Sequence, residues 1–374
     1  MKRFETAADN EPGKGILICQ CFNKQSKFER IHAQYPLKFI PTTGHADRLA
    51  VVYMLSYGGG VISGDTFDVE VKVKQDAILL LMTQGNTKIF KDRVHQRLWL
   101  SSLQQEQEGG LSAGSIVKHL ANWVPEKLRS LIHPAPAEVA PSVQLIHYTV
   151  EPHASLFVIP DPVTCFRHSS FQSRQEIHLA DDSSELILLD WFTSGRITRG
   201  ESWSFRHYSS RIHVHLGSRL VIKDAMVLED EAYMKELQEQ QQPQQHSDET
   251  AYASRLNPYL CFATLIMIAS QQQQQQQQQQ DDVSEEQKNS KALMDAVGSI
   301  QKKSEEMRLL PNSLKSAQDR EVLWSVSPVL KGRGVLVRIA GIHSEKVKDF
   351  VKQECLGKGL EQIVGDGMFK KILM

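Results

Sequence analysis

The sequence has few of the features that identify a secreted or membrane-spanning protein. Its 374 residues contain five cysteines, at positions 19, 21, 165, 261 and 355, which form neither an even disulfide framework nor a pair of C-x-x-C zinc motifs. The longest apolar run, residues 259–269, is much shorter than the roughly 20 residues that a transmembrane helix needs. We therefore expect a protein of a reducing compartment with no membrane partner.

An excess of charge of one sign is also absent. The chain has 43 Lys and Arg residues against 44 Asp and Glu residues, and its formal net charge is −1. This balance gives no overall field that would attract nucleic acid, so we expect no nucleic-acid partner. Residues 1–13 are polar and include acidic side chains, unlike a secretory signal or a transit peptide. The expected location is the cytoplasm.

What the sequence does contain is a long series of short apolar runs. Between residues 15 and 225, β-branched and alternating apolar residues recur in runs of strand length that are separated by turn residues. No helical pattern alternates regularly with these runs, which argues against a doubly wound α/β sheet. We predict a mainly β fold with a β-rich core at residues 15–225.

The character of the chain changes after residue 225. We expect residues 226–290 to form a helical and glutamine-rich insert, with helices predicted at 228–242 and 255–269. Residues 271–280 are all glutamine, and the composition of residues 270–289 predicts disorder.

The last segment, residues 291–374, is expected to return to structure. The sequence V-L-V-R-I-A within residues 329–340 predicts a strand that is too short to form its own core and so rejoins the main sheet. Apolar spacing predicts a helix at residues 344–356.

His213 and His215 are the first candidates for chemistry. An H-x-H pattern on a strand places both imidazoles on one face, where they could bind a divalent transition metal. The spacing forces no third ligand, so partly exposed strand histidines are the simpler interpretation. A metal-dependent enzyme that uses this pair is the alternative function.

Other possible nucleophiles and ligands have weak sequence support. Cys19 and Cys21 share a strand face, but inert thiols are the simpler interpretation. Ser112 lies in a G-x-S-x-G match that lacks a preceding buried strand, and Cys165 has only the nearby His168 as a candidate base. The lack of a convincing catalytic set favours a binding protein.

Charged residues at predicted turns remain: Asp65, Lys88, Asp161, Asp190, Arg196, Arg199 and Glu201. Arg196 and Glu201 flank a loop bounded by glycines, and an ordinary ion pair across it is the simpler interpretation. Alternatively, Asp65, Asp161 and Glu201 line a polar passage in which dispersed carboxylates hold a cation weakly enough to release it.

Five blocks together resemble the urease accessory protein D family, called UreD or UreH. In chain order they are L-S-Y-G-G-G-V-I-S-G-D (55–65), T-Q-G-N-T-K-I-F-K (83–91), I-P-D-P-V-T-C-F (159–166), L-L-D-W-F-T-S-G-R (188–196) and R-G-E-S-W-S-F (199–205). The resemblance covers residues 15–224 and is poor after residue 225, where the glutamine tract interrupts it.

The resemblance implies a large, multi-stranded, β-helix-like or sandwich-like body with a few helices. It also implies a non-catalytic scaffold that binds apo-urease, a helical accessory protein (UreF-like) and a nickel-carrying GTPase (UreG-like), and so supports assembly of the urease metallocentre. No cofactor would be tightly bound, and Ni²⁺ would be in transit along an internal acidic tunnel. By motif, Asp65 and Glu201, and more weakly Asp161, are the residues expected to line it.

Two further expectations follow from the segments outside these blocks. The predicted helices at residues 255–269 and 344–356 would dock the helical partner, or else pack on the protein's own sheet. A third function class is a β-rich interaction protein whose glutamine tract binds the partner.

Overall fold

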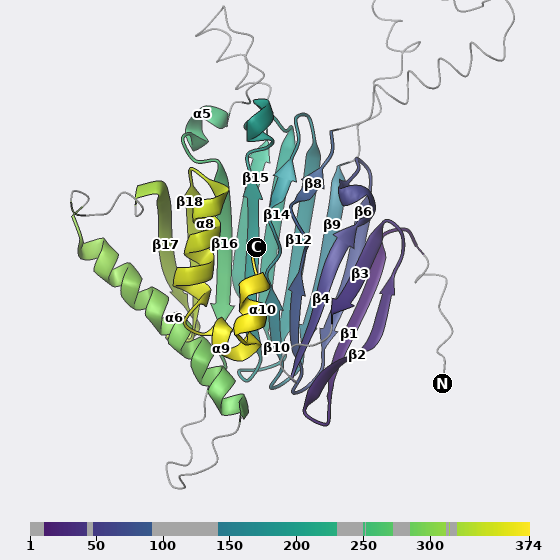
Figure 1. The fold of residues 1–374 in the computed structure, drawn as a ribbon, viewed down its shortest axis with the longest axis vertical. Helices are drawn as coiled ribbons and strands as arrows, with labels where there is room; N and C mark the ends of the chain where they lie inside the picture. The colour runs from purple at the N-terminus through teal and green to yellow at the C-terminus, as the bar shows by residue number, and fades with distance from the viewer. Residues whose placement is uncertain are drawn as a thin grey trace, which may run out of the picture.

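The computed structural model describes residues 11–42, 48–91, 141–229, 250, 252–271, 285–311, 314 and 320–374. Two β-sheets face each other, and helices cover the outer face of one of them (Figure 1). The predicted mainly β fold is therefore confirmed. Disorder was predicted for residues 270–289, of which residues 272–284 lie outside the described residues, as does Ser112.

In the described part of the chain, one sheet, here called sheet A, has seven strands in the order β15-β14-β12-β9-β6-β1-β2. Their bounds are β1 Lys14–Phe22, β2 Gln25–Ala33, β6 Thr66–Val73, β9 Ser142–Val150, β12 Ser170–Leu179, β14 His207–Leu216 and β15 Arg219–Glu229.

The other sheet, sheet B, has eleven described strands, eight of them in the order β17-β18-β16-β13-β10-β7-β4-β3, with β5, β8 and β11 paired off this path. Their bounds are β3 Leu37–Thr42, β4 Leu49–Ser56, β5 Gly60–Val61, β7 Ile78–Met82, β8 Thr87–Ile89, β10 Ser155–Val158, β11 Val163–Cys165, β13 Glu185–Thr193, β16 Cys261–Ile268, β17 Val322–Val329 and β18 Gly334–Gly341.

The chain passes back and forth between the two sheets in successive turns of a helix of strands. From β6 to β14 it alternates between sheet A and sheet B, and successive strands of the same sheet are parallel: β6, β9, β12 and β14 in one, and β7, β10 and β13 in the other. This arrangement is a flattened β-helix that forms a sandwich, in agreement with the architecture that the family resemblance implied.

Alternation along the strands of sheet A separates the core from the surface. In β6, Phe67, Val69, Val71 and Val73 are buried, whereas the intervening side chains are more exposed. The buried side chains join one apolar cluster with inward residues of sheet B. Period-two burial of this kind is expected of a sheet that is covered on one face.

Sheet B is covered on both faces, so several of its strands are apolar throughout. Every residue of β7, I-L-L-L-M, is buried. A second apolar cluster fills the space between sheet B and the helices. The helices that contribute to it are α6 Glu285–Leu309, α8 Ser344–Asp349, the π-helical segment η6 Phe350–Leu356, α9 Leu360–Val364 and α10 Asp366–Lys371.

The prediction of a helix at residues 255–269 was wrong. Only a short helix, α5 Ala253–Leu256, forms there, and β16 follows it as an inner strand between β13 and β18. Leu265 and Met267 pack toward the helices, while Ile266 and Ile268 pack between the sheets. A run that is apolar on both faces shows no period, so its pattern does not distinguish a central strand from a buried helix.

The helix predicted at residues 344–356 is confirmed as α8 followed by η6. Its buried side chains, among them Val347 and Val351, contact the protein's own sheet-covering cluster. Helix α6 begins at Glu285, inside the range where disorder was predicted. Leu228 and Glu229 complete β15 instead of starting a helix, and residues 230–242 lie outside the described part of the chain.

Candidate functional site

The glycine-rich segment, residues 55–65, forms a tight corner between β4 and β5. Gly58 and Gly59 have φ angles of 78° and 72°, which residues with a Cβ rarely adopt. Gly60 is extended and lies so close to β8 that a Cβ there would overlap the carbonyl oxygen of Lys88. The glycines therefore allow both the reversal of the chain and the close contact with β8.

Asp65 stabilises the turn that follows. Its Oδ2 accepts a hydrogen bond of 3.0 Å from the backbone N–H of Ile62, and its own N–H donates to the carbonyl of Ile62 at 2.9 Å. The carbonyl of Asp65 accepts a hydrogen bond from the N–H of Val143 at 2.9 Å. Asp65 thus connects the corner to the start of β9 in sheet A.

Asp161 connects two loops beside a small pocket. Its Oδ2 accepts a hydrogen bond of 2.7 Å from the N–H of Gly85, and its N–H donates to Thr83 Oγ1 at 2.7 Å. Burial raises the pKa of Asp161 above its usual value, although the hydrogen bond from Gly85 opposes this shift. Thr83 and Gly85 both line the pocket, so Asp161 contacts two of its lining residues without lining it itself.

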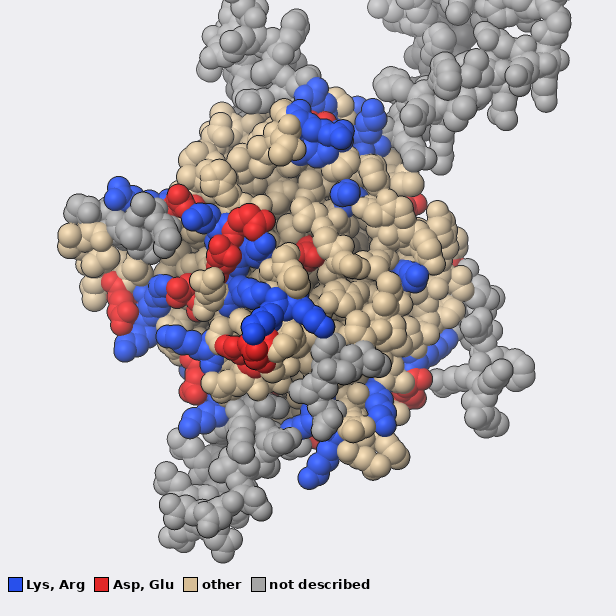
Figure 2. All heavy atoms as spheres, in the orientation of Figure 1, with Lys and Arg blue, Asp and Glu red and all other residues tan. Residues whose placement is uncertain are grey.

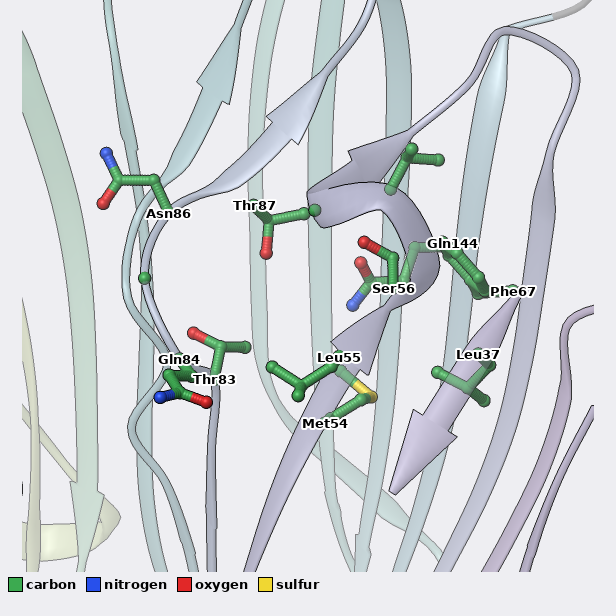
Figure 3. A pocket seen from close by; sticks show the side chains of 13 residues that line it. Leu37, Met54, Leu55, Ser56, Phe67, Thr83, Gln84, Asn86, Thr87 and Gln144 are labelled. Carbon is green, nitrogen blue, oxygen red and sulfur yellow. The ribbon is translucent and has the colours of Figure 1, made fainter. Parts of the chain in front are cut away.

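The pocket, which has a volume of about 60 Å³, lies between the glycine-rich segment and the loop that precedes β8. Figure 3 shows Gln144 of β9 and Thr87 of β8 among its lining side chains. A volume of this size holds a few water molecules. Two of the sequence blocks quoted above therefore meet at one small cavity, which both apolar and polar side chains line.

Glu201 is held by Arg196. Arg196 Nε donates to Glu201 Oε2 at 2.8 Å, and Arg196 Nη2 donates to Oε1. The guanidinium also lies 4.1 Å from the ring centroid of Phe166. Hydrogen bonding from Arg196, against partial burial, lowers the pKa of Glu201 below its usual value. The ion pair considered from the sequence is therefore present and is bidentate.

The three predicted carboxylates belong to neighbouring segments but bind different partners. β8 pairs with both β5 and β11, and β11 pairs with β13, so the loops that carry Asp65, Asp161 and Glu201 leave connected strands. Within the described residues, no hydrogen bond or ion pair joins any two of them, and they do not converge as one set of metal ligands. Their role in a cation passage stays a prediction.

A partly buried carboxylate that the sequence did not single out as a ligand lies between the sheets. Asp190 of β13 accepts hydrogen bonds from Ser210 Oγ at 2.6 Å and from Gln175 Nε2 at 3.4 Å. Burial raises its pKa to about 6, against the hydrogen bond from Ser210, and the nearby Asp224 raises it further. With this pKa, Asp190 is mostly ionised at pH 7 and becomes protonated as the pH falls below about 6.

Asp190 and Asp224 line a second pocket, of about 380 Å³, between β14 and β15 of sheet A and β13, β16, β17 and β18 of sheet B. Asp224 of β15 is 7% exposed and forms an ion pair with Arg338 Nη2 of β18. Close by, the fully buried hydroxyl of Tyr148 has no hydrogen-bond partner among the described residues, and burial followed by the charge of Asp190 raises its pKa. An unpaired buried hydroxyl beside a carboxylate is a position that water commonly fills.

The cysteines do not form a nucleophilic or thiolate site. Cys165 is fully buried, and this burial raises its pKa well above the usual value. Burial also raises the pKa of Cys19. Both thiols remain protonated at neutral pH, and all five cysteines are free of disulfides.

His213 and His215, in contrast, have partners in the structure that the H-x-H spacing did not predict. His213 Nδ1 lies 2.9 Å from Glu176 Oε1, and His215 Nε2 lies 3.6 Å from Glu176 Oε2. His178, the neighbour of His215 across β12 and β14, stacks on it with a centroid distance of 4.6 Å. Register between strands, which sequence spacing does not reveal, brings these four residues together.

The helix-covered face carries charges of both signs (Figure 2). Pairs such as Lys303 with Glu354 at 2.6 Å and Lys370 with Asp366 at 2.7 Å combine them locally. This face therefore has no strong field of a single sign. Among the described helices, none has the length and apolar character required to cross a lipid bilayer.

Comparisons with known proteins agree on one family. Residues 12–356 match the profile of a family described as "UreD urease accessory protein". The chain is 27% identical to a urease accessory protein UreD from Sorangium cellulosum over 91% of its length and 78% of that protein, and 27% identical to urease accessory protein D from Arabidopsis thaliana over 95% and 99%. It is 24% identical to urease accessory protein 4 from Cryptococcus neoformans over 96% and 95%.

Proposed function

Since the chain belongs to the UreD urease accessory protein family, we propose that it is a non-catalytic scaffold that supports assembly of the urease nickel centre. The family match over residues 12–356 carries this proposal, because it includes both sheets and most of the helices. The buried, protonated thiols and the structural partners of Asp65, Asp161 and Glu201 are consistent with a protein that forms no covalent bonds itself.

The proposed partners are those that the family resemblance implied. The chain binds apo-urease and a helical accessory protein, which in turn recruits a GTPase that carries nickel. We place this assembly in the cytoplasm. The scaffold role requires a surface whose shape persists without its partners, and the two apolar clusters on either side of sheet B provide such a body.

Nickel is cargo in this proposal. Asp65, Asp161 and Glu201 supply oxygen donors at three neighbouring loops, and Asp161 contacts residues that line one pocket. Asp190 and Asp224 line the other pocket. Separate carboxylates hold a divalent cation less tightly than a closed cage of thiolates and imidazoles, so the ion can leave again. Most of these carboxylates also have hydrogen-bond partners, which keep them in place when no cation is present.

Co-expression tests the proposal. Urease is produced together with its other accessory proteins, with and without this chain, and the nickel content and activity of the purified urease are measured. We expect apo-urease to co-purify with the tagged chain and nickel loading to depend on the chain. Full nickel loading in its absence, or no co-purification with apo-urease, would overturn the proposal.

A further inference from the structure

The outer face of sheet A, opposite to the helix-covered face of the protein, carries a group of metal-ligand side chains. Strands β12 and β14 are parallel, and their register pairs Glu176 with His213 and His178 with His215. Along β12 the flanking residues Gln175 and Ile177 are buried, and Gln175 donates to Asp190 between the sheets. Glu176 and His178 therefore point away from the interior pockets, through the opposite face of the sheet.

Three ligand atoms converge on this face. One atom each from Glu176, His178 and His215 lies within 4.8 Å of the other two. Glu176 Oε2 is 3.6 Å from His215 Nε2, which is long for a direct hydrogen bond. Two ligand atoms about 2.1 Å from one ion at a tetrahedral angle are roughly 3.4 Å apart, so a small adjustment would let both bind one ion.

Neighbouring side chains hold the carboxylate in position. Glu176 Oε1 accepts a hydrogen bond from Arg174 Nε at 2.8 Å and is 2.9 Å from His213 Nδ1. Burial disfavours ionisation of Glu176, but the hydrogen bonds from Arg174 and His213 outweigh it and lower its pKa. Because Oε1 is already engaged, Oε2 is the oxygen that is available to a ligand, and it faces His215. Partners of this kind orient a first ligand and improve metal binding.

The two imidazoles lie side by side on neighbouring strands. Desolvation and the neighbouring His215 lower the pKa of His178 below its usual value. The rings of His178 and His215 are nearly parallel, with an interplanar angle of 18°. His178 is exposed, so its ring can turn toward a shared ion without displacing packed neighbours.

We propose that Glu176, His178 and His215 bind one divalent transition-metal ion, of the Zn²⁺ or Ni²⁺ class, on the outer face of sheet A. Two imidazoles and one carboxylate suit these borderline ions and do not suit Mg²⁺ or Ca²⁺, which prefer all-oxygen ligands. Three protein ligands leave one coordination position open to water or to a donor from another molecule. This site is separate from the interior carboxylates and does not depend on the proposed role in urease assembly.

Metal titration of the purified full-length chain tests the proposal. The probe is Zn²⁺ alone, with stoichiometry and affinity measured by isothermal titration calorimetry after removal of metal. Compared with the unchanged chain, we expect His178→Ala, His215→Ala and Glu176→Gln to lose one bound equivalent or to weaken it at least tenfold. His343→Ala is the matched control, because His343 is an exposed histidine at the start of α8 over the other sheet. It should bind like the unchanged chain.

Absorption spectra with Co²⁺ in place of Zn²⁺ give a second readout, because ligand-field bands report coordination directly. Circular dichroism establishes that each variant is folded. Since His178 is exposed, His178→Ala is the variant expected to fold most like the unchanged chain. Unchanged stoichiometry and affinity in folded His178→Ala and Glu176→Gln variants would overturn the proposal. So would an equal loss in His343→Ala.

Discussion

Arg338 of β18 and Asp224 of β15 form an ion pair that connects sheet B to sheet A at one end of the sandwich. The two partners differ in environment: the side chain of Asp224 is 8% exposed, whereas that of Arg338 is 59% exposed. Removing the arginine would leave a nearly buried carboxylate without its cation. The pair also lies at the wall of the pocket of about 380 Å³, so it affects both stability and the polarity of the interior.

We predict that Arg338→Ala lowers the free energy of unfolding by about 1–2 kcal/mol, a value reduced from that of a fully buried pair because the arginine is largely exposed. Urea denaturation measures the change. Arg211→Ala, at an exposed arginine of β14, is the control and should change stability by less than about 0.5 kcal/mol. Equal effects of the two substitutions would show that the ion pair does not stabilise the contact between the sheets.

The raised pKa of Asp190 predicts that the stability of the protein depends on pH. In the folded protein its pKa is about 6, whereas the ordinary value is 3.8. Between these two values the folded state binds more protons than the unfolded state, so the contribution of Asp190 to stability falls as the pH rises from about 4 to about 6. Above pH 6 the ionised, partly buried carboxylate of Asp190 lowers the stability by up to about 3 kcal/mol.

Asp190→Asn removes the ionisable group and keeps an oxygen that accepts from Ser210. We therefore expect this variant to be more stable than the unchanged chain at pH 7.5, with the difference shrinking toward pH 4.5. Thermal unfolding across this range is the measurement. Asp76→Asn, in the surface turn between β6 and β7, serves as the control. A constant difference between Asp190→Asn and the unchanged chain at all pH values would contradict the assignment.

We predict that the adjacent positions Gly60 and Gly59 differ in how well they tolerate a side chain. A Cβ at Gly60 would overlap the carbonyl oxygen of Lys88, so Gly60→Ala should separate β5 from β8 and destabilise the fold by about 1–3 kcal/mol. At Gly59 nothing lies within 4 Å, and its φ of 72° suits asparagine. Gly59→Asn should therefore cost less than about 1 kcal/mol. Urea denaturation of both variants gives the comparison, and similar losses would argue against the close contact.

The cation passage predicts a separation between assembly and nickel loading. Glu201→Gln and Asp65→Asn keep the shape of each side chain and remove its charge. We expect both variants to co-purify with the urease complex in normal amounts but to yield urease with less nickel, measured by atomic emission. Arg196→Lys is the matched control for loop structure, because lysine cannot form the bidentate contact with Glu201 but leaves its carboxylate charged. If the two neutral variants fail to assemble, the carboxylates are structural.

The sequence predicted the β-rich body well, because alternation such as that of β6 is a local property. It failed at β16, where an inner strand of a doubly covered sheet loses the alternation that would have identified it. The helix at residues 344–356 was predictable because only one of its faces contacts the sheet. Local pattern therefore revealed the elements that are half exposed and misassigned one that is buried on both sides.

The candidate sites were predictable only in part, for a related reason. The H-x-H pattern placed His213 and His215 on one face, but their neighbours Glu176 and His178 come from another strand, and only the register of β12 against β14 brings them close. Asp190 lies in the apolar block L-L-D-W-F, which gave no sign that its side chain faces a pocket. The pairing of Arg196 with Glu201 could be predicted from the sequence because both residues belong to one short loop.

The winding of the chain fixes how far apart the two pockets lie. One pocket contacts β4, β6 and β9, and the other contacts β13 to β18. The coil of the β-helix that contains β10 and β12 lies between them. Each additional parallel coil would move them apart by one strand spacing, about 4.8 Å. Extra residues in a loop at the rim would leave that spacing unchanged, so relatives of different length can share the same internal dimensions as long as they keep the same number of coils.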